Sequence, residues 1–183
     1  EELLYDSVFN LEAYISQEFA RRIGSLEEEA FLVGDGTGKP TGVFNSAQTG
    51  VTSASASAIN FDDIFDLFYS LKAAYRKNGI WICNDTTVKA LRKLKDANGQ
   101  YLWQPSVSAG TPDMLLNRPI KTSSYAPEIQ TGKTPIIFGD FSYYWIADRQ
   151  GRSFKKLAEI YSETDEVGFK TTERVDGKLL LPE

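Results

Sequence analysis

Hydrophobic residues recur every three or four positions over residues 3–33, which is the spacing of one face of an α-helix. A helix of this length would extend ~45 Å at ~1.5 Å per residue, well beyond the average helix of ~11–12 residues. It is therefore either a coiled-coil strand or a scaffold on which a sheet lies, and Gly24 is a place where it could bend. The apolar face comprises Leu4, Val8, Leu11, Ile15, Phe19, Ile23, Leu26 and Ala30.

The middle of the chain predicts two more helices with a strand between them. Residues 61–79 carry an apolar stripe of helical spacing. The short apolar run IWIC at 80–83 predicts a buried strand, and residues 84–96 predict a helix capped by Asn84 or Asp85. A strand, a cap and a helix in this order indicate an α/β layer.

The last third of the chain is rich in strand signals. Strands are predicted at 120–125, at 136–138, at 143–146 and, as a pair or meander, at 167–181. Arg149-Gln150-Gly151 predicts a hairpin turn, and Asn98-Gly99 predicts a sharp turn. Small and polar residues indicate loops at 46–60 and 106–119.

The composition narrows the possible functions. The chain has 42% hydrophobic residues, a formal net charge of −5 and scattered basic residues, which disfavours direct binding to nucleic acid. No apolar run approaches the ~20 residues of a membrane helix. The chain has no histidine, which excludes a Ser-His-Asp triad and histidine zinc sites. The single cysteine, Cys83, has apolar neighbours and is expected to be buried. We therefore expect no catalytic residue, no metal and no cofactor.

The glycine-rich stretch FLVGDGTGKPTGVFN at 31–45 is the strongest candidate for a phosphate loop, and it fails on spacing. A Walker A loop has four residues between its glycines and a Ser or Thr after the lysine. Here only three residues separate Gly34 from Gly38, and Pro40 follows Lys39. A phosphate loop also opens a helix, whereas this one follows a predicted helix. A helix stop followed by turns, with glycines at positive φ, fits better.

Other candidate sites have simpler interpretations. The acidic residues Asp62, Asp63 and Glu27–Glu29 lie beside apolar helix faces and are expected to be solvated or first-turn charges. The aromatic run Tyr143–Trp145 is expected to be strand packing, with a platform for binding or adhesion as the alternative.

Four segments in register resemble the major capsid proteins of tailed bacteriophages of the Hong Kong 97 type. Residues 27–45 resemble the end of that family's spine helix and the glycine segment after it, and 84–105 resemble its cap, helix and LKDxxGxYL stretch. Residues 114–120 resemble a third segment, with Asn117 where glycine is usual. Residues 136–151 resemble its Gly-Asp-Phe turn and the strands that follow. Together the four segments span nearly the whole chain.

The resemblance implies a Hong Kong 97-like α+β architecture with a long spine helix, a peripheral-domain sheet and an axial α/β domain. Residues 1–45 would be the spine helix and glycine linker, 46–140 the axial domain, and 141–183 the return to the peripheral strands. The family's N-terminal arm and extended loop precede the spine helix and are not in this sequence. Together with a first residue, Glu1, that is not methionine, this predicts a fragment. The implied hinge or linker residues are Gly34, Asp35, Gly36, Gly38, Pro40 and Gly42, and the hallmark turn is Gly139, Asp140 and Phe141.

The implied function is that of a structural subunit of an icosahedral phage or prophage head, without catalysis. Its partners would be other copies of itself in pentamers and hexamers, with a scaffolding protein, a maturation protease and a portal as further candidates. No membrane and no sequence-specific nucleic acid is expected. It would be located in the virion, and in the host cytoplasm before assembly. Some relatives join their subunits by a lysine–asparagine bond promoted by a glutamate, but Asp165 and Thr172 stand near those positions here, so no such crosslink is expected.

Three alternatives remain, one of which is a binding or adhesion module with the aromatic strand 143–145 as its platform. A bacterial encapsulin shell shares the fold, although the motifs at 34–42 and 139–151 favour the phage branch. An enzyme that binds nucleotide through the loop at 34–42 is an alternative from a different functional class.

Overall fold

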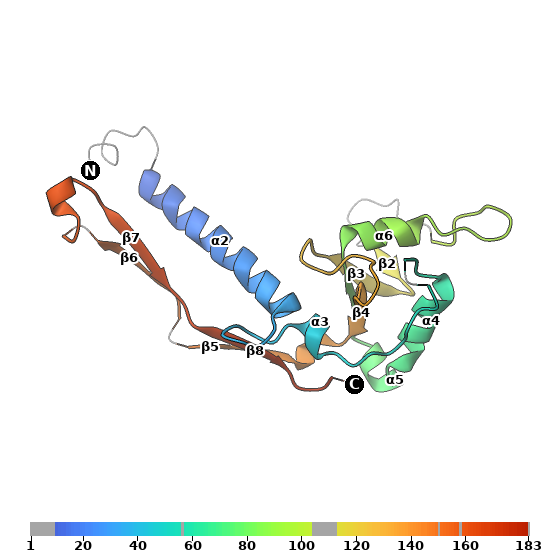
Figure 1. Cartoon of the computed structure of the whole chain (residues 1–183). Coiled ribbons are helices and arrows are strands. Elements are labelled where there is room, and N and C mark those ends of the chain that lie inside the picture. Colours follow the sequence, from blue (N-terminus) through green and yellow to red (C-terminus); the bar gives the residue numbers. More distant parts are fainter. Residues whose placement is uncertain (1–9, 56, 104–112, 150, 158, 183) are drawn as a thin grey trace.

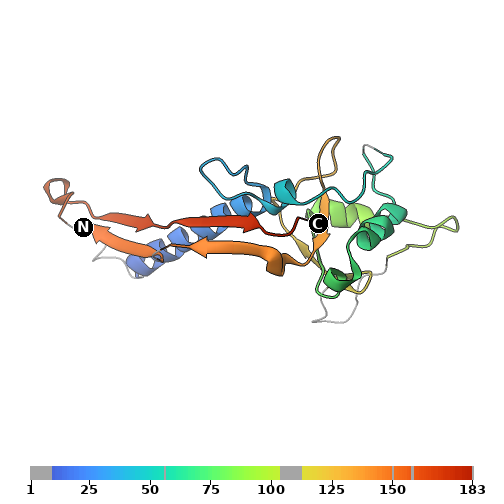
Figure 2. The same ribbon diagram turned by 90° about the horizontal axis from the view of Figure 1, so that it is seen from below.

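The molecule has an elongated arm at one end and an α/β domain at the other (Figure 1). The computed structural model describes residues 10–55, 57–103, 113–149, 151–157 and 159–182. The arm consists of one long helix lying along a narrow β-ribbon, and both views show the two running side by side (Figures 1 and 2). Residues 3–9 of the predicted long helix and residues 106–112 of the predicted loop lie outside the described residues.

The long helix, α2 (Leu11–Val33), confirms the prediction from residue 11 onward. Asn10 caps it, because its side-chain oxygen accepts a hydrogen bond of 3.0 Å from the backbone N–H of Ala13. The helix continues through Gly24 without interruption. The predicted apolar face is wrong at Leu26, which is 65% exposed. Glu27, one position along, is the residue that turns toward the ribbon.

The ribbon is a single long hairpin built in two paired segments. Its outgoing half consists of β5 (Tyr144–Asp148) and β6 (Ser153–Leu157), and its returning half of β7 (Gly168–Thr172) and β8 (Val175–Leu179). β6 pairs with β7, and β5 pairs with β8, both antiparallel. The strands predicted within 167–181 are confirmed, but their partners are the strands before them rather than each other.

The hairpin turn predicted at Arg149-Gln150-Gly151 is wrong. The backbone N–H of Arg149 donates to the carbonyl of Arg174 at 2.9 Å, so the two halves of the ribbon still face each other there. Gln150 itself lies outside the described residues. Glycine and polar residues occur at interruptions between paired strand segments and also at turns, so the sequence alone does not distinguish the two. The reversal comes further on, beyond β6, where the short helix η2 (Ser162–Thr164) lies.

The contact between α2 and the ribbon includes aromatic pairs but buries few side chains. Phe19 meets Phe154 edge to face with ring centroids 6.0 Å apart, and Phe31 meets Tyr144 in the same way at 6.1 Å. No described residue of α2 is fully buried. This arrangement supports the scaffold interpretation of the long helix rather than a coiled coil.

The α/β domain is built on a mixed four-stranded sheet in the order β2-β3-β1-β4. β1 runs parallel to β3 and antiparallel to β4. The strands are β1 (Ile80–Cys83), β2 (Met114–Leu115), β3 (Arg118–Thr122) and β4 (Ile136–Gly139). The helices of this part of the chain are α3 (Val43–Ser46), α4 (Phe61–Ser70), α5 (Ala73–Arg76) and α6 (Asp85–Arg92).

Trp81 is the centre of the core of this domain. It is fully buried, its ring stacks on Phe138 at 4.3 Å, and its indole N–H donates to the carbonyl of Leu115 at 2.9 Å. Cys83, two residues along the same strand, is buried as predicted. Burial raises the pKa of its thiol to about 12, which makes it an inert apolar residue.

The helix predicted at 61–79 is wrong in one respect, because it is broken into α4 and α5. Leu71 and Lys72 adopt extended backbone conformations, with ψ of 136° and 141°. The break lets Arg76 fold back so that its guanidinium lies 5.0 Å from the ring centre of Tyr69. These are tertiary contacts, which helical spacing alone does not reveal.

The helix predicted at 84–96 is confirmed as α6, with Asn84 rather than Asp85 as its cap. The Asn84 side-chain oxygen accepts from the backbone N–H of Thr86 at 3.0 Å. Its amide group donates to the carbonyl of Ala126 at 3.0 Å, so the same residue also anchors a loop.

The turn between β2 and β3 explains why asparagine can stand at position 117, where the capsid proteins that this chain resembles usually have glycine. Leu116 and Asn117 have φ of 50° and 59°, the left-handed conformation of a two-residue hairpin turn. Asparagine tolerates this conformation better than other residues with a side chain, and glycine tolerates it best.

We expect Asn117→Gly to preserve or slightly raise the free energy of unfolding and Asn117→Val to lower it by about 1–2 kcal/mol, because a β-branched residue is strained at positive φ. Lys121→Val, at an exposed position in the middle of β3, is the control and should be tolerated. Urea denaturation followed by tryptophan fluorescence measures all three. Equal stability of the Gly and Val variants would contradict the assigned turn.

Candidate functional site

The glycine-rich segment 34–42, here called the glycine clasp, folds back on itself between α2 and α3. Gly34 ends the helix as predicted, and its N–H donates to the carbonyl of Ala30 at 2.9 Å. Asp35 and Thr41 form an antiparallel bridge, and the N–H of Gly42 donates to the carbonyl of Gly34 at 2.9 Å. The start and the end of the clasp therefore touch, and the chain leaves close to where it entered.

The clasp uses its glycines for two different physical reasons. Gly36 and Gly38 have φ of 78° and 68°, which confirms the expectation of positive φ. Gly34 has an ordinary φ of −58°, so that expectation is wrong there. A Cβ on Gly34 would lie 2.1 Å from the carbonyl oxygen of Pro40, and one on Gly42 would lie 2.5 Å from the nitrogen of Gly34. These two positions need glycine because backbone meets backbone.

Hydrogen bonds fix the clasp to the ribbon and to α2. The N–H of Thr41 donates to the carbonyl of Gly177 in β8 at 3.1 Å, and the Tyr144 hydroxyl of β5 donates to the carbonyl of Thr41 at 3.0 Å. The side-chain amide of Asn45 donates to the carbonyls of Val33 and Gly34 at 2.9 Å each. Burial raises the pKa of Tyr144 to about 12, so its hydroxyl keeps its proton and remains a donor.

Several of the groups that could hold a phosphate are engaged within the protein. The N–H groups of Gly34, Thr41 and Gly42 donate to backbone carbonyls. The N–H of Thr37 donates to the Asp35 carboxylate at 2.9 Å, and this bond is the main reason that the pKa of Asp35 is lowered. The ammonium group of Lys39 lies 3.6 Å from the same carboxylate. The clasp thus presents an ionised acid where a phosphate site would present free donors.

The second hallmark, Gly139-Asp140-Phe141, lies where the chain passes from the α/β domain into the ribbon. Asp140 caps the short helix η1 (Phe141–Tyr143), since its carboxylate accepts from the N–H of Ser142 at 3.0 Å and from its hydroxyl at 2.7 Å. These bonds lower the pKa of Asp140. The chain crosses the junction twice, once through each predicted motif.

A small apolar core joins the two crossings. Val43 and Phe44 of α3, Ala126 and Ile137 are its buried members. Further apolar residues from the end of α2, β1, η1 and the ribbon pack against it: Leu32, Val33, Ile82, Phe141, Tyr144 and Leu179. The clasp and the hallmark turn therefore belong to one structural unit.

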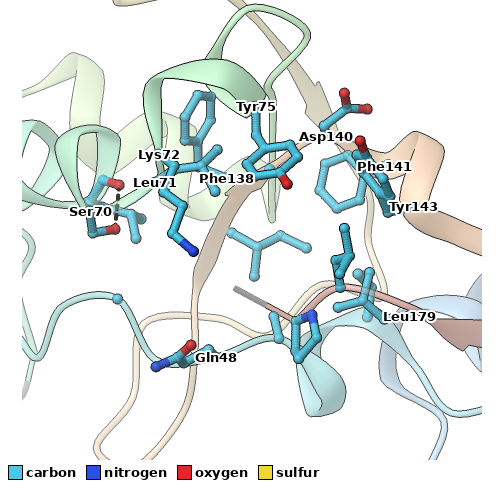
Figure 3. A pocket seen from close by; sticks show the side chains of 18 of the residues that line it. Gln48, Ser70, Leu71, Lys72, Tyr75, Phe138, Asp140, Phe141, Tyr143 and Leu179 are labelled. Atoms are coloured by element: carbon cyan, nitrogen blue, oxygen red, sulfur yellow. Dashed lines mark hydrogen bonds between the residues drawn. The ribbon is translucent and has the colours of Figure 1, made fainter.

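Beside this core is a pocket of about 380 Å³. Ser70 and Lys72, at the break between α4 and α5, stand on one side of it, and Phe141, Tyr143 and Leu179 stand on the other (Figure 3). Tyr75 lies with the second group, since it packs against Tyr143. Sequence reasoning missed this pocket, because its walls come from segments far apart in the chain and no local motif marks it.

The aromatic run at 143–145 is not brought together on one surface. Tyr143 packs edge to face against Tyr75 at 5.5 Å, and Tyr144 lies under the clasp. Only Trp145 is largely exposed, at 65%. Two of the three residues are packed inside the junction, which supports the packing interpretation over a binding platform.

The described part of the chain offers no obvious chemical centre. Within it, no group of three or more His, Cys, Asp or Glu side chains is placed to hold a metal ion. No helix among the described residues is long and apolar enough to cross a membrane.

Comparison with known proteins identifies the family. A profile described as the phage capsid family matches residues 1–183. The chain belongs to the phage capsid family. No curated protein matches it.

Two solved structures are similar to this capsid-family chain over nearly its whole length. The capsid of a native gene transfer agent (GTA) particle, computed with C5 symmetry, is 31% identical with a TM-score of 0.89 and covers 100% of this chain. The capsid of the empty GTA particle is 32% identical with a TM-score of 0.84 and covers 97%. This chain spans 66% and 65% of those two capsid chains. The expected α+β fold of the Hong Kong 97 type is confirmed.

We expect Gly34→Ala to lower the free energy of unfolding by about 1–3 kcal/mol, because the added methyl group meets backbone atoms that cannot move aside independently. Gly24→Ala in the middle of α2 is the matched control. No atom lies within 4 Å of a Cβ there, so it should raise stability by about 0.5–1 kcal/mol. Both variants can be measured by urea denaturation, and a Gly34→Ala variant as stable as the parent would contradict the close approach.

Tyr144→Phe removes the bond to Thr41, so we expect a loss of about 0.5–1.5 kcal/mol at pH 8. The pKa of Tyr144 is raised from 10 to about 12 on folding, so the hydroxyl contributes its stability below pH 10 and loses it as the pH rises through 12. The difference between parent and variant should therefore shrink above pH 10. Denaturation curves at pH 8 and pH 11 provide the test, and a constant difference would contradict the assigned bond.

Proposed function

We propose that this chain is a structural subunit of an icosahedral phage or prophage head that assembles with copies of itself around the DNA genome. The observation that carries the proposal is the match of the whole chain to the phage capsid family, together with a TM-score of 0.89 at 31% identity to a capsid chain. No catalytic step is part of this role, and no cofactor is needed for it.

The shape of the arm supports assembly with other copies. A two-stranded ribbon leaves one hydrogen-bonding edge of each strand open, and such a ribbon is at best marginally stable by itself. α2 covers one side of the ribbon and has no fully buried residue among those described. Both layers of the arm therefore have surface left for neighbours. Contacts between different surfaces of identical subunits build closed rings when the rotation closes.

The two-part organisation follows the proposed capsid domains. Residues 1–45 and 141–183 would form the peripheral domain, which contains α2 and the ribbon, and residues 46–140 would form the axial domain. The two crossings of the junction lie close to 45 and 141, which supports this division. The clasp residues Gly34, Asp35, Gly36, Gly38, Pro40 and Gly42 and the turn residues Gly139, Asp140 and Phe141 would then be the linker between the domains.

The partners would be other copies of the chain, in pentamers and hexamers of the full-length protein. A scaffolding protein, a maturation protease and a portal are further candidate partners. The protein would occupy the host cytoplasm before assembly and the particle shell afterwards. The net charge of −5 would limit adhesion to the enclosed DNA. The residue types at Asp165 and Thr172 favour a shell without lysine–asparagine crosslinks.

Negative-stain electron microscopy of the protein extended to the length of the matching capsid chains tests the proposal. We expect uniform hollow icosahedral particles, because the arm and the α/β domain then have their full set of neighbours. Nuclease-resistant DNA in particles from the native host would favour a phage head over an encapsulin compartment. Only small oligomers, with and without scaffold and protease, would contradict the shell function.

The 183-residue chain is the control for that experiment. We expect it to be monomeric or weakly associated in light scattering. A stable closed ring formed by this chain alone would contradict that expectation.

A further inference from the structure

Two carboxyl groups and one guanidinium group meet between α2 and the ribbon. Glu27 lies on α2, Arg152 immediately precedes β6, and Glu173 lies between β7 and β8. The Nη2 atom of Arg152 is 2.8 Å from Glu27 Oε2, and its Nε atom is 2.5 Å from Glu173 Oε1. The sequence predicted that Glu27 would be a solvated charge, and the structure contradicts this.

Both carboxyl groups are withdrawn from solvent, whereas the guanidinium is not. The side chain of Glu27 is 16% exposed and that of Glu173 is 8% exposed, compared with 61% for Arg152. Glu173 Oε2 is buried and accepts no hydrogen bond. A buried carboxylate oxygen without a donor is costly. Two buried acids facing one cation leave the cluster one positive charge short.

The missing donor has to come from within the cluster. An ammonium or guanidinium group of another molecule cannot reach Glu173 Oε2, because the atom has almost no accessible surface. The Glu27 carboxyl is the candidate, because it lies within hydrogen-bonding reach of the Glu173 carboxyl. Burial and the adjacent carboxyl of Glu173 raise the pKa of Glu27, and they outweigh the opposing effect of Arg152.

Glu27 is surrounded by few other charges. Its neighbours on the same face of α2, one turn before and after it, are the uncharged Ile23, Gly24, Ala30 and Phe31. From the ribbon, Arg152 faces it on the outgoing half and Glu173 on the returning half. The proton balance of the cluster therefore depends mainly on these three groups.

We propose that Glu27 holds a proton that it donates to Glu173, and that the two acids and Arg152 form an acid-strengthened latch. This latch holds α2 to the ribbon at the interruption between its two paired segments. The latch lies between the two aromatic contacts of the arm, Phe19 with Phe154 and Phe31 with Tyr144. With the proton bound, Glu27 donates to Glu173 and Arg152 neutralises the remaining charge. Without it, two carboxylates repel each other in a poorly hydrated space.

The direction of the pH effect follows from the raised pKa. The protonated form of Glu27 is favoured in the folded chain, so the latch contributes its full stability below the ordinary glutamate pKa. That contribution is lost as the pH rises through the value in the folded protein. Acid therefore tightens the arm, and a neutral or alkaline medium loosens it. The proposal concerns the arm of the isolated chain and does not depend on the proposed shell function.

Glu27→Gln tests the latch, because a glutamine amide can donate to Glu173 at every pH. We expect Glu27→Gln to raise the melting temperature at pH 8 by about 2–4 °C. This gain should shrink as the pH falls toward 4.5, because the pKa of Glu27 is raised and the parent chain then carries more of the proton. Glu29→Gln is the matched control, two residues along the same helix and exposed, and it should not reproduce this pattern. Glu173→Gln should reproduce the pattern of Glu27→Gln.

A carbon-13 NMR titration of the glutamate carboxyl groups provides a readout that does not rely on a variant. We expect the Glu27 midpoint above the ordinary value for glutamate, because burial and the Glu173 carboxyl raise its pKa. A Glu27 midpoint at or below the ordinary value would overturn the proposal. So would a Glu27→Gln effect on melting temperature that is the same at pH 4.5 and pH 8. Either result would leave the shell function to be decided by the particle experiment.

Discussion

Close contact of backbone with backbone in the glycine clasp is the constraint on which the rest of the structure depends. Gly34 and Gly42 meet at a distance that excludes any side chain at either position. Because they meet, the end of α2 is fixed beside α3, and α3 in turn packs on the core that joins ribbon and α/β domain. Thr41 and Tyr144 then attach this point to both halves of the ribbon. One short segment thus sets the direction of the helix, the ribbon and the domain together.

The arm itself has little of the apolar burial that usually stabilises a helix. Helices in proteins are stabilised mostly by packing of an apolar face, and no described residue of α2 is fully buried. Its contacts with the ribbon are a few aromatic pairs and ion pairs, such as Lys156 with Glu12 at 3.5 Å. Exposed ion pairs of this kind contribute little. Neighbouring molecules in an assembly would therefore add much of the stability that the arm lacks alone.

Sequence reasoning succeeded where the determining interactions are local. The strand at 80–83, the helix after Asn84 and the end of α2 at Gly34 are specified by apolar runs, caps and glycines within a few residues. It failed where distant partners decide. The break at Leu71 goes with tertiary contacts of Arg76. The strand pairing of the ribbon depends on a chain reversal that lies beyond β6, far from the turn residues at 149–151.

The candidate site shows the same division. The glycine motif could be located from the sequence, and the resemblance gave its position in the fold. The reason for each glycine could not be found in this way, because Gly34 and Gly36 look alike in a sequence and differ in what surrounds them. Similarly, Glu27, Glu28 and Glu29 are chemically identical. They differ only in the folded protein. Glu27 is largely withdrawn from solvent, Glu28 accepts a hydrogen bond from Ser123, and Glu29 is exposed.

The ribbon has a mechanical consequence because each of its halves runs the length of the arm. Tension applied at the far tip is carried along two covalent backbones in parallel, and the hydrogen bonds between them lie across the direction of pull. Stretching the arm therefore does not open these bonds one after another. Bending is different, because the ladder is interrupted between β5 and β6 on one side and between β7 and β8 on the other. The arm is thus stiff in extension and has one built-in place at which it can flex.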